Sequence, residues 1–360
     1  MTKPILAAFL SCQGTHLSDD EKVIFNKSNP VGITLFARNI ENKIQLKQLI
    51  SEIKETIGRD NVLIAVDQEG GRVRRLKEPE FRSYSSQYDI GALSTNKALK
   101  AAKIHAVLMA NDLHKLGINV NNAPVLDIIH PKTTKALRSR CFSSSAKKIS
   151  TLGKKMVETY IKNGIIPCIK HMPGHGLAIN DPHLGLSIIN ISLDELQYEM
   201  LPFKNCNFAP LGMTAHILLP QIDDKFPLTQ SKIGIQKLIR EQIGFNGLLI
   251  SDSIDMRALK GTIIEKTKLS LSAGCDCVCY CMGNTAEMFE LTQNCPYLSD
   301  IANERLDKAL QILHNKPSVF DLIEKESLYD QLMGEIVPYQ DTYDATEVLH
   351  KMTREEIKNV

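Results

Sequence analysis

Short apolar runs alternate with longer helical patterns along most of this chain, and this alternation limits the possible folds more than any other feature. Eight runs are expected to be strands, namely Ile5–Ser11, Gly32–Phe36, Val62–Val66, Val120–Asn122, Ile165–Ile169, Gly212–Ala215, Leu248–Ser251 and Cys277–Cys281. Eight strands that alternate with helices favour a parallel barrel over a doubly wound sheet. We therefore predict an α/β fold, a (β/α)8 TIM-type barrel.

The expected barrel occupies residues 1–315 as a single catalytic domain. A chain of 360 residues is long enough for one large barrel, and no internal repeat, low-complexity tract or Gly/Ser linker divides it. After Pro296 the pattern becomes helical over Ile301–Asn315 and is then polar and charged. Residues 316–360 are expected to be a C-terminal extension, with short helices packed on the barrel.

The charge balance gives no support for binding to nucleic acid or to an anionic membrane. The 43 Lys and Arg against 41 Asp and Glu leave a net charge of only +2. No apolar run approaches the roughly 20 residues that span a bilayer, and residues 4–11 read as a first strand rather than an export signal. We expect neither nucleic acid nor a membrane as a partner.

The nine cysteines point to a reducing compartment, because their number is odd and a chain of this size does not need disulfides for stability. We expect these cysteines to be free thiols. Cys275, Cys277, Cys279 and Cys281 resemble a metal cluster at first sight. In a strand, however, alternate side chains repeat about every 6.6 Å, too far apart for four thiolates to share one zinc. They are expected to be small apolar residues of a buried strand.

Polar residues that end the apolar runs are the candidates for chemistry, because the active groups of such barrels lie at the C-terminal ends of the strands. They are Asp67, Asn122, Lys170, His171, His216 and Asp252. Asp67 could accept hydrogen bonds from substrate hydroxyls, and Arg75 could donate to them. We expect Glu69 to pair with Arg72 and hold the loop between them.

A segment rich in Gly, Pro and His, residues 169–185, follows the fifth predicted strand. Within it, Asp181 could orient His183, and such a dyad can give a proton to a leaving oxygen and later remove one from a nucleophile. His175 is expected to brace the loop through internal hydrogen bonds. A metal site built from these histidines is not expected, because the spacing matches no zinc motif and Lys170 would repel a cation.

Asp252 completes the candidate set. A carboxylate at a strand end, opposite a proton donor, is the arrangement for double displacement at the anomeric carbon of a sugar. Asp252 could instead cap the next helix, although Ser253 could do so equally well. Asp255 is a second carboxylate nearby, but Asp252 is the one that directly follows the strand. Lys170 could donate to a ligand oxygen or act as a Schiff-base nucleophile.

At these residues the sequence resembles the β-N-acetylglucosaminidases of glycoside hydrolase family 3, over roughly residues 5–315. The motifs that carry the resemblance recur there in the same order: Gly32–Asn39, Asp67–Val73, Ala123–Asp127, Lys170–Gly176, Met213–His216 and Ser251–Asp252. One departure is Pro182, where the family usually has Ser. Proline fixes its own φ and favours an extended conformation at Asp181.

The resemblance implies a retaining exo-β-N-acetylglucosaminidase. Asp252 would be the nucleophile, and Asp181 and His183 the acid/base pair on a mobile loop. The contacts to the sugar ring would be made by Asp67, Arg75, Arg140, Lys170 and His171. The implied reaction removes non-reducing terminal GlcNAc from GlcNAc-1,6-anhydro-muropeptides during peptidoglycan recycling, and the implied location is the cytoplasm. The resemblance implies no metal and no organic cofactor, and we expect a monomer that binds a small carbohydrate.

Three alternatives remain open at this point. The chain could be a catalytically impaired GlcNAc-binding protein of the same fold, a lyase that uses Lys170, or an enzyme in which phosphate rather than water resolves the intermediate.

Overall fold

The computed structural model, which describes residues 3–315 and 321–339, contains a closed barrel of eight parallel strands. Neighbouring strands follow the order β1-β10-β9-β7-β5-β4-β3-β2. Their bounds are β1 Leu6–Ser11, β2 Pro30–Leu35, β3 Leu63–Val66, β4 Val120–Asn121, β5 Ile166–Met172, β7 Leu211–Thr214, β9 Leu248–Ser253 and β10 Cys277–Cys279. The predicted (β/α)8 barrel is confirmed, with one strand in each of the eight predicted places.

The strands are buried on both faces, which explains why they read as continuous apolar runs rather than alternating ones. Every residue of β1, β2 and β9 is buried. Phe9 of β1 lies in register with Gly32 of β2. A Cβ atom at Gly32 would lie 2.5 Å from the Phe9 ring and 2.4 Å from the carbonyl oxygen of Leu63. Only glycine therefore fits at this point of the barrel wall.

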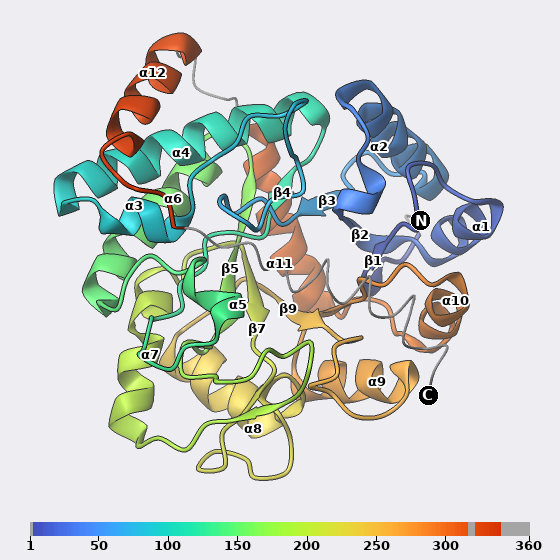
Figure 1. Cartoon of the computed structure of the whole chain (residues 1–360). Helices are drawn as coiled ribbons and strands as arrows, with labels where there is room; N and C mark the ends of the chain where they lie inside the picture. The colour runs from blue at the N-terminus through green and yellow to red at the C-terminus, as the bar shows by residue number, and fades with distance from the viewer. Residues whose placement is uncertain (1–2, 316–320, 340–360) are drawn as a thin grey trace, which may run out of the picture.

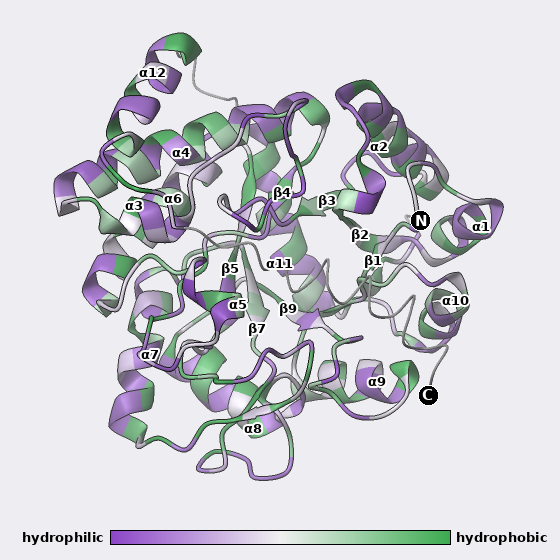
Figure 2. Cartoon of the chain, in the orientation of Figure 1, coloured by the Kyte–Doolittle hydropathy of each residue, from purple (hydrophilic) through white to green (hydrophobic). Residues whose placement is uncertain are grey.

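Helices form a ring around the strands (Figure 1). The longer ones are α1 Asp19–Ser28, α2 Lys43–Ile57, α4 Thr95–Leu116, α6 Ala146–Lys162, α7 Leu193–Asn205, α9 Ile263–Ala273, α10 Thr285–Asn294, α11 Asp300–Leu310 and α12 Leu322–Met333. Shorter helical elements are α3 Gln87–Ala92, α5 Lys135–Arg138, α8 Lys232–Gly234 and the π-helix Ile235–Gln242. Hydrophobic colouring follows the strands and the helix faces turned toward them (Figure 2).

Local sequence signals set the starts of several helices. Ser18 and Glu21 form a capping box at α1, and the pairs Ser192–Glu195 and Thr262–Glu265 do the same at α7 and α9. In each box the hydroxyl accepts from a backbone N–H, and the carboxylate accepts in return, so two otherwise unpaired donors are satisfied.

Three predicted C-terminal strand ends differ from the observed ones by two residues or more. β5 continues through Lys170 and His171 to Met172, and β9 continues through Asp252 to Ser253. We expected these strands to stop at Ile169 and Ser251. Lys170 and His171 remain in β5 because residues from other segments of the barrel mouth pair with them, as described below. β10 is shorter than expected and ends at Cys279.

Part of the expected C-terminal extension is described. It contains α12, which packs against α4, and Tyr329 of α12 is buried with its hydroxyl 2.9 Å from Nδ1 of His105. Residues 316–320 and 340–360 of that extension lie outside the described residues. In the described ranges, no helix is both long and apolar enough to cross a membrane.

Candidate active site

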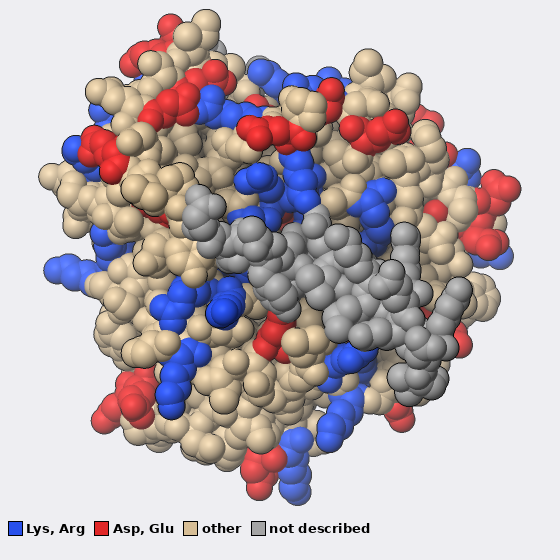
Figure 3. Space-filling view, in the orientation of Figure 1, with Lys and Arg blue, Asp and Glu red and all other residues tan. Residues whose placement is uncertain are grey.

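One pocket at the C-terminal ends of the strands is lined by all the residues that the family resemblance implies for catalysis and sugar binding. These are Asp67, Arg75, Arg140, Lys170, His171, Asp181, His183 and Asp252. The candidate Asn122 also lines it, whereas the candidate His216 does not. They come from segments far apart in sequence that the barrel brings to one mouth. Lys and Arg side chains gather around the middle of the face seen in Figure 3, while most Asp and Glu lie toward its edge.

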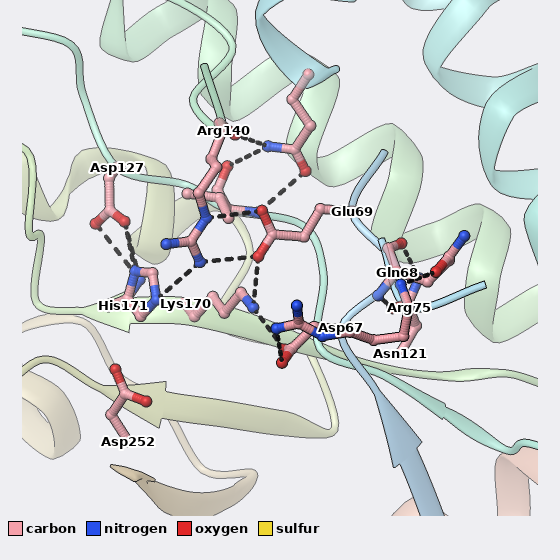
Figure 4. Close-up of polar contacts among 12 residues, drawn as sticks. Asp67, Gln68, Glu69, Arg75, Asn121, Asp127, Arg140, Lys170, His171 and Asp252 are labelled. Carbon is pink, nitrogen blue, oxygen red and sulfur yellow. Dashed lines mark hydrogen bonds and ion pairs between the residues drawn. The ribbon is translucent and has the colours of Figure 1, made fainter. Parts of the chain in front are cut away.

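Lys170 lies at the centre of a buried ionic cluster (Figure 4). Its Nζ is 3.0 Å from Oδ1 of Asp67 and 2.7 Å from Oε1 of Glu69. Arg140 donates two hydrogen bonds to Glu69, at 2.9 and 2.8 Å, and Arg75 donates to Oδ2 of Asp67 at 3.2 Å. Opposite charges therefore alternate along one wall of the pocket.

The expected pair between Glu69 and Arg72 is wrong. Glu69 pairs with Arg140 and Lys170, while Arg72 donates to the hydroxyl of Ser139 and to the carbonyl of Ala136. Arg140 is distant from Glu69 in the sequence, but the loop that contains α5 places it beside Glu69 at the mouth of the barrel. Residues near in sequence were the only partners that the sequence alone suggested.

Mutual pairing keeps these groups charged despite their burial. Burial alone would raise the pKa of Asp67, but Lys170 and Arg75 hold it well below its usual value. In the same way, Arg140 and Lys170 outweigh burial and lower the pKa of Glu69 to about 2. The two carboxylates raise the pKa of Lys170 against the effect of burial. An ammonium group held in this way cannot attack a carbonyl, which argues against the Schiff-base alternative.

Asp127 fixes the backbone and the ring of His171. Its Oδ2 is 2.7 Å from Nδ1 of His171, and its carboxylate also accepts from the backbone N–H groups of His171 and His175. Arg140 donates to Nε2 of His171 at 3.4 Å. Since arginine can only donate, Nε2 accepts and Nδ1 carries the proton that it donates to Asp127.

His175 braces its loop, but not through its ring as expected. Its backbone N–H donates to Asp127 at 2.7 Å, whereas neither ring nitrogen has a hydrogen-bond partner among the residues that the structure describes. The ring contacts the edge of His171, with centroids 5.6 Å apart. Burial and the neighbouring His171 lower the pKa of His175 to about 4, so the ring is neutral at neutral pH.

The loop that carries Asp181 and His183 closes one side of the pocket. Nδ1 of His183 lies 2.7 Å from Oδ1 of Asp181. His183 donates its own backbone N–H to the same oxygen, at 3.0 Å. Burial opposes ionisation of Asp181, but the hydrogen bond from His183 lowers its pKa overall. The dyad is therefore formed as predicted, and Nε2 of His183 is left for exchange of a proton in the pocket.

Two contacts anchor this loop. β6 Ser187–Ile188 pairs with β8 Ile217–Leu218 in a small parallel sheet directly after the dyad. The carbonyl of Pro182 accepts from the N–H of Ala258, at 3.1 Å. The second contact joins the dyad loop to the segment that follows Asp252.

Asp252 projects from the end of β9 into the pocket (Figure 4). Burial alone would raise its pKa, but His171, His216 and the N–H of Ser253 lower it. That N–H donates to Oδ1 of Asp252 at 2.7 Å, and Nε2 of His216 donates to the carbonyl of Ser253 at 2.9 Å. Asp252 is therefore an ionised carboxylate on a fixed backbone, as a nucleophile requires.

Sequence reasoning missed Asp127 as a positioning residue, and it found Glu69 but gave it the wrong partner. Asp127, which ends the apolar run Pro124–Leu126, orients His171, and Glu69 connects Lys170 to Arg140. A carboxylate directly after an apolar run was the available signal for Asp127. The described residues contain no group of three or more His, Cys, Asp or Glu side chains placed to hold a metal ion.

Comparison with known proteins places this geometry in context. The model of the glycosyl hydrolase family 3 N-terminal domain matches residues 7–315. A beta-hexosaminidase of Xanthomonas oryzae pv. oryzae is 34% identical over 74% of this chain and 81% of its own length. One of Bordetella avium is 30% identical over 81% and 82%.

Solved structures give the same result. Crystal structures of NagZ from Neisseria gonorrhoeae are 28% identical to this chain and cover 92% of it and 98% of their own length. The complex with zinc ion superposes with a TM-score of 0.80, and the complex with N-trifluoroacetyl-D-glucosamine with 0.79. The similarity thus extends over most of the chain, including the barrel.

Proposed function

Because the chain belongs to glycosyl hydrolase family 3 and is a β-N-acetylhexosaminidase, we propose that it removes non-reducing terminal GlcNAc by a retaining double displacement. One observation carries the proposal. The ionised Asp252 and the Asp181–His183 dyad open into the same pocket, beside a wall of paired cations and carboxylates. The pocket thus holds a nucleophile, a proton donor and groups suited to sugar hydroxyls.

In the first step, a carboxylate oxygen of Asp252 attacks C1 of the sugar. The bond from C1 to the leaving oxygen breaks, and that oxygen takes the proton from Nε2 of His183. Asp181 accepts from Nδ1 of His183 and stabilises the charged imidazole. The product of this step is a glycosyl ester on Asp252.

In the second step, a water molecule attacks C1 from the side that the aglycone has left. Nε2 of His183 takes a proton from this water, and the Asp252 carboxylate leaves. Two inversions at C1 retain the configuration. A neutral imidazole repels anions less than a carboxylate does, so product analysis with and without phosphate must identify the second nucleophile.

The sugar ring is proposed to lie against Asp67, Arg75, Arg140, Lys170 and His171. Lys170 and Arg75 are buried and already hold Asp67 in place, so little side-chain entropy is lost when a sugar binds. Carboxylate acceptors and cationic donors together can satisfy a pair of neighbouring hydroxyl groups. A protonated Lys170 fits this binding role.

The substrate is proposed to be a GlcNAc-1,6-anhydro-muropeptide released during peptidoglycan recycling, hydrolysed in the cytoplasm by a monomer. The relative that binds N-trifluoroacetyl-D-glucosamine supports the choice of sugar. The Lys and Arg side chains around the middle of the face in Figure 3 support an anionic aglycone, since peptide carboxylates would be attracted to them.

Covalent trapping tests the proposal. The protein is treated with a fluorinated GlcNAc analogue that forms the glycosyl ester faster than it hydrolyses, and its peptides are analysed by mass spectrometry. We expect one sugar adduct on Asp252, which persists in Asp255→Asn and is absent from Asp252→Asn. Tight GlcNAc binding without adduct or turnover would instead identify an impaired binding protein.

A further inference from the structure

Two cysteine sulfurs lie next to each other in the wall of the sugar pocket. Sγ of Cys279 and Sγ of Cys281 are 3.5 Å apart, and both residues line the pocket with Asp252. Because β10 ends at Cys279, the chain no longer follows strand geometry beyond that residue. The sulfurs are therefore much closer than the roughly 6.6 Å expected of alternate residues in a strand.

All nine cysteines are free thiols. A disulfide needs an S–S distance of about 2.05 Å and a Cα–Cα distance below about 7 Å. Residues two apart in an extended chain are separated by about 6.6 Å or less, so closing this pair requires the sulfurs to approach by about 1.5 Å. Cys281 lines the pocket and is less buried than Cys279, so it is the first of the two thiols that a small oxidant in the pocket meets.

We propose that Cys279 and Cys281 are a site of reversible oxidation, where a hydroperoxide closes a disulfide in the pocket wall and lowers turnover. The disulfide is independent of the proposed function, whereas its effect on turnover rests on that function.

The chemistry balances with hydrogen peroxide as the oxidant. The Cys281 thiolate attacks one peroxide oxygen and breaks the O–O bond, which gives a sulfenic acid and, with the thiol proton, one water. The sulfur of Cys279 then attacks the Cys281 sulfur and expels hydroxide, which takes the Cys279 proton as a second water. Two thiols and one peroxide thus become one disulfide and two waters, and a dithiol reductant reverses the change.

Hydrogen bonds connect this pair to the proposed nucleophile. The N–H of Cys281 donates to Oδ1 of Asp255 at 2.8 Å, and the hydroxyl of Ser253 donates to the same oxygen. The N–H of Ser253 in turn donates to Asp252. Movement of Cys281 toward Cys279 therefore acts on Asp255 and on the backbone that orients Asp252.

A second contact also depends on the position of Cys281. Its carbonyl accepts from Nη2 of Arg38 at 2.6 Å, and the Arg38 guanidinium lies 4.7 Å from the centre of the Phe36 ring. Phe36 lines the pocket. Disulfide closure thus disturbs the wall at two points.

Oxidation is expected to be slow. The hydrogen bond with Cys279 and burial raise the pKa of Cys281, so little thiolate is present at neutral pH. An excess of peroxide and a time course are therefore part of the test.

Differential alkylation tests the disulfide. Protein is incubated with or without hydrogen peroxide, denatured and alkylated, then reduced and alkylated with a second reagent of different mass. We expect the mass of the intact chain, before alkylation, to fall by that of two hydrogen atoms. The second reagent should label Cys279 and Cys281 only. Cys206→Ala should give the same pattern, while Cys279→Ser and Cys281→Ser should not form the bond.

Turnover of an aryl β-GlcNAc is measured on the same samples, each variant compared with itself before oxidation. Turnover of the wild-type protein should fall several-fold and return after reduction, whereas Cys279→Ser should lose much less. If the first reagent alkylates both Cys279 and Cys281 after peroxide treatment, no disulfide has formed there, and the proposed site is wrong. A disulfide without a change in turnover would overturn its control of the pocket. Absence of turnover before oxidation would instead count against the proposed function. The disulfide would then be tested by the mass measurement alone.

Discussion

Several residues of this pocket carry a charge although they are buried. This arrangement is stable only because each of them has a partner of opposite charge. Lys170 lies between Asp67 and Glu69, and Arg140 satisfies the other side of Glu69. Removing one member leaves another as an uncompensated buried charge, a change that typically costs about 3–5 kcal/mol. The groups proposed to bind the sugar are therefore also part of the stability of the barrel mouth.

Replacement of Glu69 by Gln should make stability less dependent on pH. Because the folded pKa of Glu69 is about 2 against an ordinary 4.5, its contribution is complete above about pH 4.5 and is lost as the pH falls toward 2. At about pH 6 we expect Glu69→Gln to be less stable than the wild type by about 3 kcal/mol, with the gap narrowing by about pH 3.

Urea unfolding at the two pH values measures this gap. The exposed Glu304→Gln should show no difference from the wild type at either pH. A gap for Glu69→Gln that stays constant with pH would show that Glu69 titrates normally.

Replacement of His183 by Ala should slow substrates with poor leaving groups most. General acid catalysis contributes about 10²- to 10⁴-fold, but a very acidic phenol leaves without a proton. We expect kcat/KM to fall by about that factor for an alkyl or weakly acidic aryl β-GlcNAc, and far less for a dinitrophenyl β-GlcNAc. Leu184→Ala, on the same loop, should affect both substrates alike. Equal losses for both substrates in His183→Ala would assign the proton to another group.

Among the elements, the segment that joins β5 to the dyad loop depends on close backbone packing. A Cβ atom at Gly176 would lie 1.8 Å from the carbonyl oxygen of Ile128, whereas one at Gly185 would meet nothing within 4 Å. Backbone atoms cannot yield as a flexible side chain can. The fold therefore requires glycine at the first position and only tolerates it at the second.

Gly176→Ala and Gly185→Ala form a matched pair, one before and one after the Asp181–His183 dyad. We expect Gly176→Ala to lower the unfolding free energy by more than about 2 kcal/mol and to reduce kcat/KM, since overpacking displaces the backbone. Gly185→Ala should change stability by less than about 1 kcal/mol. Thermal unfolding and steady-state kinetics on both variants decide the point, and equal behaviour would contradict the close packing.

Strands and helix starts could be predicted from the sequence where they depend only on residues nearby in the chain. Apolar runs such as that in β3 and helix starts such as Ser18–Glu21 depend on neighbours in the chain. The ends of β5 and β9 were missed because Lys170 and Asp252 look like loop residues when only their neighbours in the chain are considered. For the same reason the pairing of Glu69 with Arg140 could not be derived, although both residues were found.

On the scale of the whole molecule, α12 extends the core beyond the barrel. Tyr329 packs on Tyr84 and His105 and places its hydroxyl on His105. Burial lowers the pKa of His105 to about 4, so the ring is neutral at neutral pH. We propose that the C-terminal extension stabilises the barrel from the side of α4.

Tyr329→Phe tests this contribution. It leaves Nδ1 of His105 buried without its partner, so we expect a loss of about 1–3 kcal/mol in unfolding free energy with unchanged turnover. Tyr297→Phe, at an exposed tyrosine, should change neither. Urea unfolding measures both variants, and a stable Tyr329→Phe would show that the extension adds nothing through this contact.

The barrel closes where β1 meets β10, and the pocket wall includes both Thr34 and Cys279. During synthesis, a nascent chain that has not yet reached residue 277 has neither the last strand nor a complete pocket wall. We therefore expect nascent or truncated chains of this kind to be inactive until the last strand has joined the first.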